Sequence, residues 1–149
     1  MVNIIYQLIK SCNRSQPHME VLKHSLNIIE NLSRDPDTSS AVFWATGGLE
    51  ILVDSAQAYR ENEMVFESVV TILLIHLEVA SDHANRRRAM KTMAPEVKKL
   101  RGVLTVMERK VERETRSRPG VVVQSKQSAH TAMLVSSVNK LRRIVELLR

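Results

Sequence analysis

The sequence predicts an all-α protein, built as a stack of repeated helices that is followed by long C-terminal helices. Apolar residues recur at spacings of three and four throughout the chain, which is the pattern of one helix face. Four glycines and four prolines in 149 residues are too few for an all-β fold with frequent turns. Two helical segments also recur about 45 residues apart. Such a period is typical of armadillo and HEAT-type stacks, which are more often binding scaffolds than enzymes.

The repeat is carried by apolar positions. A shift of 44 residues places Ile5 on Leu49, Leu8 on Leu52, Ile9 on Val53 and Cys12 on Ala56. A shift of 45 residues places Val21 on Phe66, Ser25 on Val70, Ile28 on Leu73, Ile29 on Leu74 and Leu32 on Leu77. The extra residue fits a loop that differs in length by one residue between the paired helices.

The first two helices are expected over residues 2–12 and from Pro17 to about Ser33. Proline suits the first turn of a helix, and the polar stretch 11–17 separates the two. The inward positions of the first helix are Ile5, Leu8, Ile9 and Cys12. The apolar face of the second consists of Val21, Leu22, Ser25, Leu26, Ile28, Ile29 and Leu32.

One complete three-helix unit follows, with helices at 38–46, 49–59 and 64–79. Asp37 or Thr38 is expected to cap the short first helix, and Gly47-Gly48 ends it, because a helix C-terminus favours a residue free to take positive φ. We expect full burial of Ile28, Ile29, Leu52 and Leu74. Residues 1–80 thus form the armadillo-like region. Because only two helices of the preceding unit are visible, the chain is expected to start inside a stack, with Ile4 and Tyr6, or residues beside them, exposed.

Residues 81–118 are predicted to form basic helices that continue the stack. A short helix is expected over 82–93, and Pro95 opens a long one over 95–117. The stretch 119–127 is interpreted as a linker before a C-terminal amphipathic helix within 128–149. The apolar stripe of the first long helix is Val97, Leu100, Leu104, Met107 and Val111, and that of the second is Leu134, Val138, Leu141, Val145 and Leu148. These helices could pack antiparallel on each other or close the end of the stack.

Two runs resemble a known family. Residues 9–33 (IKSCNRSQPHMEVLKHSLNIIENLS) and 40–61 (SAVFWATGGLEILVDSAQAYRE) are similar to the C-terminal region of the abnormal spindle family, most specifically in SCNRS with the following Pro17 and Glu20-Val21. The resemblance covers residues 2–80, is weaker over 81–117 and fades beyond Pro119. An invertebrate member of the family is expected.

The resemblance implies a role at the mitotic spindle. Family members are very large microtubule-associated proteins of the cytoplasm, cytoskeleton and spindle pole or centrosome, and of the nucleus in interphase. They focus microtubule minus ends in cell division and matter for neurogenesis. Microtubule-binding and calponin-homology regions and calmodulin-binding IQ motifs precede an armadillo-like C-terminal domain. This chain contains no Ile-Gln pair and hence no IQ motif.

Charge is distributed unevenly. Residues 1–82 contain 5 lysines and arginines against 11 acidic residues, a net charge of −6, whereas residues 83–149 contain 17 against 5, a net charge of +12. The basic half predicts an acidic partner, namely the tails of tubulin in microtubules or a spindle-pole adaptor, although long helices often carry basic residues only as a solvated face. Nucleic acid is disfavoured, because residues 83–149 contain no aromatic residue. The candidate basic face comprises Arg86, Arg87, Arg88, Lys91, Lys98, Lys99, Arg101, Arg109, Lys110 and Arg113, with Arg116 beyond them.

The final helix offers an alternative function. Leu134, Leu141 and Leu147 have the 1-8-14 spacing of some calmodulin targets, and Arg142 and Arg143 lie among them. This pattern predicts a calcium-dependent calmodulin-binding module. A basic amphipathic helix that simply packs against its own domain has the same pattern.

Other chemistry is weakly supported. Armadillo units bind extended peptides through asparagine amides on the third helix, and Asn27, Asn31 and His76 occupy the corresponding places.

The sequence contains no phosphate loop, zinc-type spacing or catalytic constellation, so neither a cofactor nor a metal is expected. The single cysteine, Cys12, excludes an intramolecular disulfide, and no apolar run reaches the 18 residues that a membrane span needs. The sequence therefore predicts a non-catalytic scaffold domain.

Overall fold

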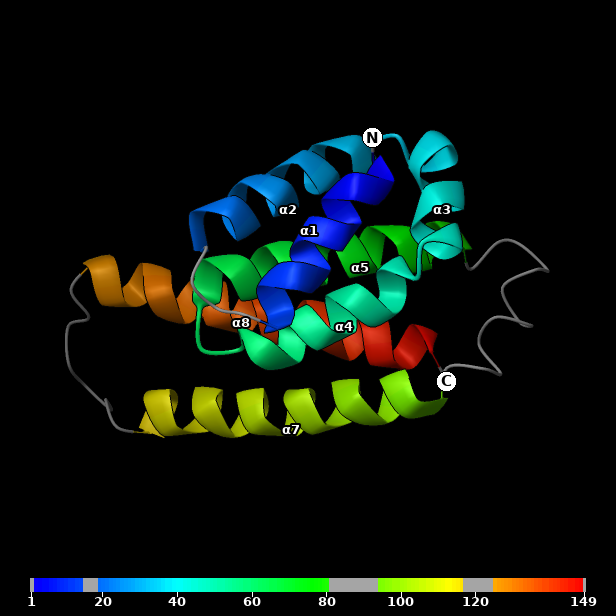
Figure 1. Ribbon diagram of the computed structural model, residues 1–149. Helices are drawn as coiled ribbons and strands as arrows, with labels where there is room; N and C mark the ends of the chain where they lie inside the picture. The colour runs from blue at the N-terminus through cyan, green and yellow to red at the C-terminus, as the bar shows by residue number, and fades with distance from the viewer. Residues whose placement is uncertain (1, 15–18, 81–93, 117–124, 149) are drawn as a thin grey trace.

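The computed structural model describes residues 2–14, 19–80, 94–116 and 125–148, and in these ranges every regular element is an α-helix. The prediction of an all-helical protein is thus confirmed for this part of the chain. The helices are α1 (Val2–Arg14), α2 (Met19–Ser33), α3 (Pro36–Ala45), α4 (Gly48–Ala58), α5 (Glu63–Ala80), α7 (Ala94–Arg116) and α8 (Ser125–Leu147) (Figure 1).

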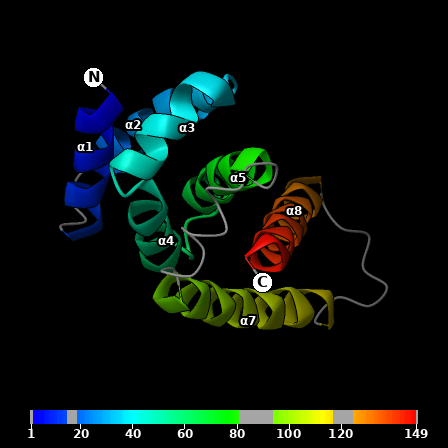
Figure 2. The same cartoon turned by 90° about the vertical axis from the view of Figure 1, so that its right-hand side faces the viewer.

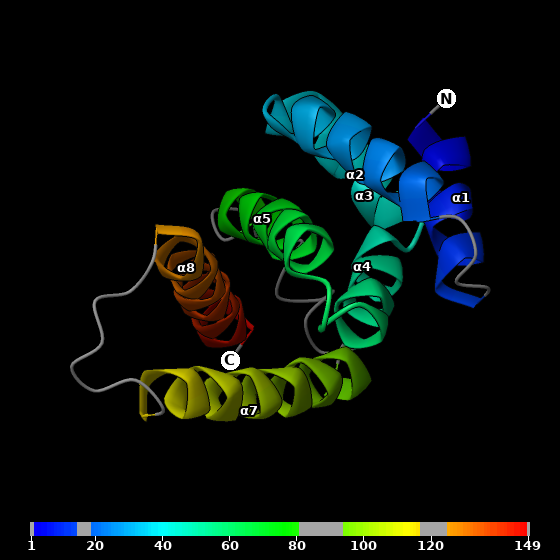
Figure 3. The ribbon, with the colours of Figure 1, turned by 90° about the vertical axis from the view of Figure 1, so that its left-hand side faces the viewer.

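The helices are arranged in two rows. The helices α2, α5 and α8 pack side by side in that order, and α1, α4 and α7 form the second row beneath them (Figures 2 and 3). Each member of the first row also contacts its counterpart in the second, so that α1 pairs with α2, α4 with α5 and α7 with α8. Helix α3 fills the corner between α2, α4 and α5. The two long helices therefore pack on each other and also extend both rows.

The boundaries of α3 follow from proline and glycine. The helix begins at Pro36, two residues earlier than expected, because proline suits the first helical position. Gly47 has φ +69°, the left-handed conformation that favours glycine. Gly48 is required for a different reason, since a Cβ there would lie 2.7 Å from Cδ2 of Phe43. The glycine pair thus serves both the turn and the close packing of α3 against α4.

Polar side chains also join α1 to α4. The amide of Asn13 donates to the carbonyl oxygen of Ile51 at 3.1 Å, and its Oδ1 lies 2.8 Å from Oγ of Ser55. The hydroxyl of Tyr59 donates to the carbonyl oxygen of Cys12 at 2.5 Å. Asn13 and Cys12 belong to the SCNRS run. This distinctive part of the sequence therefore positions α1 against α4.

Burial of the repeat positions confirms some predictions and corrects others. Ile29 and Leu52 are fully buried as expected, but Leu74 is only half-buried and Ile28 is 45% exposed. The predictions of buried Leu8, Val21 and Leu32 were also wrong, since these side chains are exposed. For Val21, Ile28 and Leu32 the physical reason is their place in the row. Helix α5 lies between α2 and α8, whereas among the described helices α2 has a neighbour in its row, α5, on one side only.

The expectation for the start of the first helix is half right. Ile4 is exposed, as predicted, but the prediction for Tyr6 was wrong because its side chain is 1% exposed. The Tyr6 ring packs edge-on against Phe43, with ring centroids 6.3 Å apart, and burial raises the pKa of its hydroxyl. Cys12 is buried as expected, and burial raises the pKa of its thiol.

The long helices follow their predicted stripes closely. Every residue of the α8 stripe is buried. In α7, Leu100 and Met107 are buried with Val103, while Val97, Leu104 and Val111 are partly buried against the same core. Helix α8 begins at Ser125, within the stretch expected to be a linker. The short helix expected at 82–93 lies outside the described residues.

In the described ranges, no helix has the length and apolar character needed to cross a membrane. The same ranges bring together no group of three histidine, cysteine, aspartate or glutamate side chains that could hold a metal ion.

Candidate interaction surface

The surface of α7 that faces away from the core is strongly basic. Because a helix turns once in 3.6 residues, the positions opposite the buried stripe fall on one face. Their exposed basic side chains are those of Lys98, Arg101, Arg109, Arg113 and Arg116, which we call the outer basic face. Glu112 is the one acidic residue among them. At 1.5 Å per residue, the face extends over about 27 Å.

The charges of the outer basic face are directed to solvent. In the described part of the chain, no acidic side chain forms an ion pair with Lys98, Arg101 or Arg109. Nε of Arg113 donates to the carbonyl oxygen of Arg109 at 3.3 Å, which holds that side chain along the helix without neutralising it. This face is therefore a row of positive charge that is available to another molecule.

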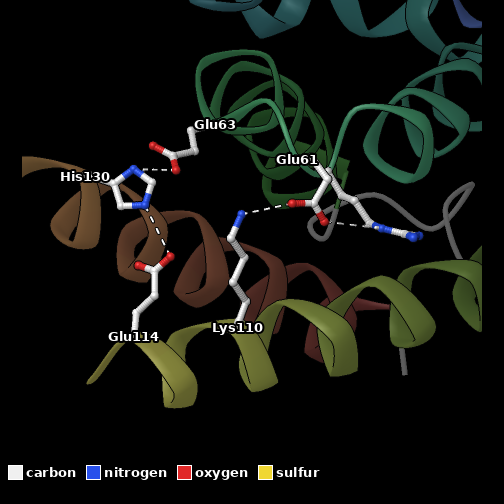
Figure 4. Close-up of polar contacts among 6 residues, drawn as sticks. Glu61, Glu63, Lys110, Glu114 and His130 are labelled. Carbon is white, nitrogen blue, oxygen red and sulfur yellow. Dashed lines mark hydrogen bonds and ion pairs between the residues drawn. The ribbon is translucent and has the colours of Figure 1, made fainter. Parts of the chain in front are cut away.

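Two basic residues on the flank of α7 are used differently. Nζ of Lys99 lies 2.9 Å from Oδ1 of Asp54 on α4, and this hydrogen bond raises the pKa of Lys99. Nζ of Lys110 lies 3.2 Å from Oε2 of Glu61, in the turn before α5. Both residues were predicted to bind a partner, and the structure places them in ion pairs that join α7 to the repeat region. Figure 4 shows the pair of Lys110 and Glu61.

Helix α8 pairs its charges in the same way. Lys140 and Ser137 both contact the carboxylate of Glu67 on α5, and Lys140 also donates to Oγ1 of Thr71 at 3.0 Å. The guanidinium Nε of Arg142 donates to Oε1 of Glu108 on α7 at 2.7 Å. Glu67 of the first half and Glu108 of the second therefore neutralise part of the basic charge of α8 inside the molecule.

His130 joins three helices. Its Nδ1 lies 2.5 Å from Oε1 of Glu63 at the start of α5, and its Nε2 lies 3.3 Å from Oε1 of Glu114 near the end of α7 (Figure 4). The imidazole thus lies between two carboxylates that belong to different helices. Sequence reasoning missed this contact, and the partners of His130 are too far apart in the chain to be found from spacing.

The remaining basic candidates cannot be placed. Arg86, Arg87, Arg88 and Lys91 lie outside the described residues. Of the basic face expected from the sequence, the structure brings together the outward residues of α7 and separates them from Lys99 and Lys110.

The candidate peptide-groove residues do not share a surface. Asn27 and Asn31 are exposed on α2, where Nδ2 of Asn31 donates to Oδ1 of Asn27 at 3.3 Å. His76 is 0% exposed. Its ring stacks on Phe43 with centroids 4.2 Å apart, and burial lowers its pKa from the ordinary 6.5 to about 4. The imidazole of His76 is therefore a neutral core group, which has no direct access to a ligand on the surface.

The candidate calmodulin anchors lie in the core. Leu134 and Leu141 are 1% and 0% exposed, and Leu147 is half-buried. Arg142 and Arg143 point outward, and Nε of Arg143 lies 3.8 Å from Oε1 of Glu78. The apolar anchors are thus covered as long as α8 is packed between α5 and α7.

Comparison with known proteins confirms the resemblance noted in the sequence. Over 61 residues the chain is 39% identical to the abnormal spindle-like microcephaly-associated protein of Homo sapiens, and to its homologues in Pongo pygmaeus and Felis catus. The matched stretch covers 41% of this chain but only 2% of each relative. No family model matches the chain. No solved structure matches it either.

Proposed function

We propose that this chain, through its sequence relationship to the abnormal spindle-like microcephaly-associated proteins, is a non-catalytic scaffold module of a spindle-associated protein. The outer basic face of α7 binds an acidic surface on its partner. The observation that carries this proposal is the separation of charge within α7. The lysines on its flank are paired internally, whereas five cations along its outer face are directed to solvent.

The scaffold is proposed to be armadillo-like. Three helix pairs in two parallel rows, with a sequence repeat of about 45 residues between the first two, support this arrangement. A stack of this kind has a long surface and few loops, which suits it to holding other molecules.

Microtubules are the proposed acidic partner, and spindle poles the proposed location. The acidic tails of tubulin are attracted to a row of cations without a shaped pocket, and a partner bound in this way associates rapidly and dissociates with added salt. The absence of aromatic residues from residues 83–149 continues to argue against single-stranded nucleic acid, which binds by base stacking. In the whole protein, this contact would contribute to spindle-pole focusing and spindle organisation.

Co-sedimentation with microtubules tests the proposal. Reversal of Arg101, Arg109 and Arg113 to Glu changes the charge of the outer basic face by six units without touching the buried stripe. We expect at least a tenfold weaker association, with unchanged helicity by circular dichroism. We also expect weaker binding of the unmodified chain to microtubules whose acidic tails have been removed, and in about 0.2 M salt, where screening is strong.

A matched control separates position from net charge. Lys10, Arg14 and Arg34 are exposed on and beside α1 and α2, and their reversal to Glu changes the total charge by the same amount. This variant should bind microtubules nearly as well as the unmodified chain. Equal loss in both variants would show that only net charge matters, and full binding by the α7 variant would overturn the proposed site. Reversal of Arg86, Arg87 and Arg88 measures the contribution of the adjoining basic stretch.

A further inference from the structure

Helices α1 and α2 lie at the end of the two rows farthest from α7 and α8 (Figure 3). Both helices expose large apolar side chains. Apolar patches of this kind on a protein surface commonly mark interfaces. The exposed side chains are those of Ile4 (65%), Leu8 (43%), Val21 (43%), Ile28 (45%) and Leu32 (37%). We call them the α1–α2 outer face.

Most of the exposed positions interspersed with these side chains are uncharged, namely Gln7 and Ser11 on α1 and Asn27 and Asn31 on α2. His24 also lies among them, and Glu20 at the start of α2 is the charged exception, with Oε1 3.1 Å from Nζ of Lys23. Charged residues are depleted at the centre of protein interfaces, because burial of a charge is costly. The α1–α2 outer face therefore has the composition of a surface that becomes covered.

The opposite end of the first row has a different composition. Helix α8 exposes Asn139, Arg142, Arg143 and Glu146, and its exposed large apolar side chains, Met133 and Val135, are each only 36% exposed. The charged residues suit this face to remain in water. Repeat stacks need a polar outer face on their terminal units to stay soluble. One end of this stack has such a face, and the α1–α2 end does not.

The internal repeat identifies what covers this face. Val21, Ile28 and Leu32 correspond to three residues of α5 that are 0–1% exposed, namely Phe66, Leu73 and Leu77. Leu8 corresponds to Leu52, which is 0% exposed. The α4–α5 pair has the α1–α2 pair packed against it, whereas the described helices leave the equivalent side of α1–α2 open. On the α4–α5 pair, the equivalent face is thus covered by the helical hairpin α1–α2.

We propose that the α1–α2 outer face docks a further amphipathic helical hairpin, which packs on it as α1 and α2 pack on α4 and α5. The contacting side of this hairpin is aliphatic and poor in charge. A second copy docked head to tail would present its charged α8 end, which does not complement an apolar face. The proposal rests on the repeat and the exposed side chains and not on binding by α7, so either can fail without the other.

A designed fusion tests the proposal with this chain's own hairpin. Residues 1–48 are joined directly ahead of Ile5, so that the added copy lies one repeat before the original. The junction keeps Gly48 in the place of Ile4, because Phe43 leaves no room for a Cβ there. We expect the fused protein to melt about 5 °C or more above the original chain, since exposed aliphatic side chains become buried.

A substitution shows whether the gain comes from the proposed contact. Ile28→Asp in the original copy should remove the rise in Tm of the fused protein. In the unfused chain the same change should shift Tm by only about 1–2 °C, because Ile28 is already exposed to water. A fused protein with the Tm of the original chain would overturn the proposal.

Two further measurements exclude other outcomes. If the direct fusion does not fold, the same residues joined through a Gly-Ser linker repeat the test, and the lack of a Tm gain there overturns the proposal. Sedimentation of the unfused chain tests face-to-face association of two copies. A monomer at all concentrations supports a separate hairpin as the occupant, whereas a dimer that Ile28→Asp dissociates would assign the face to self-association and overturn the proposal.

Discussion

Oγ of Ser33 on α2 lies 2.9 Å from Nε2 of His76 on α5, a buried hydrogen bond between residues 43 positions apart. Ser33 donates its own hydrogen to the carbonyl oxygen of Ile29 at 2.7 Å, so it accepts from the Nε2–H of the imidazole. Burial lowers the pKa of His76 and so favours the neutral ring, in which Nδ1 carries no hydrogen and accepts from Oγ of Ser40 at 3.3 Å. In the neutral ring, the hydrogen bond from Nε2–H to Ser33 selects one tautomer.

Stability should therefore fall as the pH is lowered from 6.5 towards 4. The pKa of His76 is about 4 in the folded protein and near the ordinary 6.5 when unfolded, so the unfolded chain binds the additional proton in this range. The contribution is fully present above pH 6.5 and is lost as the pH falls to about 4. Its full size is roughly 3 kcal/mol, and urea unfolding at several pH values measures it.

The variant His76→Gln serves as the control for this prediction. It should be less stable at pH 7 by about 1–3 kcal/mol, because it loses the stacking on Phe43 and part of the hydrogen bonding. Between pH 6.5 and 4 its stability should change less than that of the unmodified chain. Parallel pH profiles for the two proteins would show that the imidazole does not titrate as we expect.

Leu52 and Leu8 provide a matched pair for testing the packing of the repeat. The two leucines occupy equivalent positions 44 residues apart, but Leu52 is 0% exposed and Leu8 is 43% exposed. Leu52→Ala should lower the free energy of unfolding by about 2–5 kcal/mol, and Leu8→Ala by less than about 1 kcal/mol. Denaturant titration of both variants checks this difference, and similar losses would contradict the packing described here.

Glu67 should couple strongly to Lys140 across the contact between α5 and α8. Both side chains are partly buried, less exposed than those of Asp54 and Lys99, and Glu67 also accepts from Ser137. A double-mutant cycle with Glu67→Gln and Lys140→Met should give a coupling energy of about 1–3 kcal/mol. The exposed pair Asp54–Lys99 is the comparison, for which we expect less than about 1 kcal/mol. A cycle that ranks the exposed pair above the partly buried pair would contradict this view of the interface.

Calmodulin should bind the intact chain poorly. Leu134 and Leu141 are buried between α5 and α7, so binding requires α8 to leave the core, and the affinity is reduced by the small fraction of molecules in that state. We expect the affinity for Ca²⁺-calmodulin to be at least about 100-fold lower than that of a synthetic peptide of residues 128–149. Equal affinities would show that α8 detaches readily and would favour the calmodulin-binding function.

Apolar periodicity predicted the helices and their apolar stripes. It did not predict which stripes are covered by a neighbouring helix. The stripe of α8 and the Gly47-Gly48 turn are local in sequence, and both were predicted correctly. Ile28 and Leu32 are as apolar as their buried counterparts in α5, so their exposure follows from the absence of a neighbouring helix among those described, which composition does not reveal.

The candidate site was also predicted only in part, because the sequence shows where charges lie along the chain but not which charges pair. The cluster of basic residues was visible in the sequence, because charge can be counted along the chain. The pairing of Lys99 with Asp54 and of Lys110 with Glu61 was not, since these partners are 45 and 49 residues apart. Only the three-dimensional arrangement separates the cations that stabilise the fold from those that face solvent.

The internal charge pairs affect the choice of reagent for studying this protein. A peptide that contains only α7 and α8 would lack Asp54, Glu61 and Glu67, so Lys99, Lys110 and Lys140 would become free. It would also uncover the leucines of α8. Such a fragment should bind acidic polymers and calmodulin more tightly than the folded chain, and a positive result with it would report the chemistry of the exposed peptide instead of that of the domain.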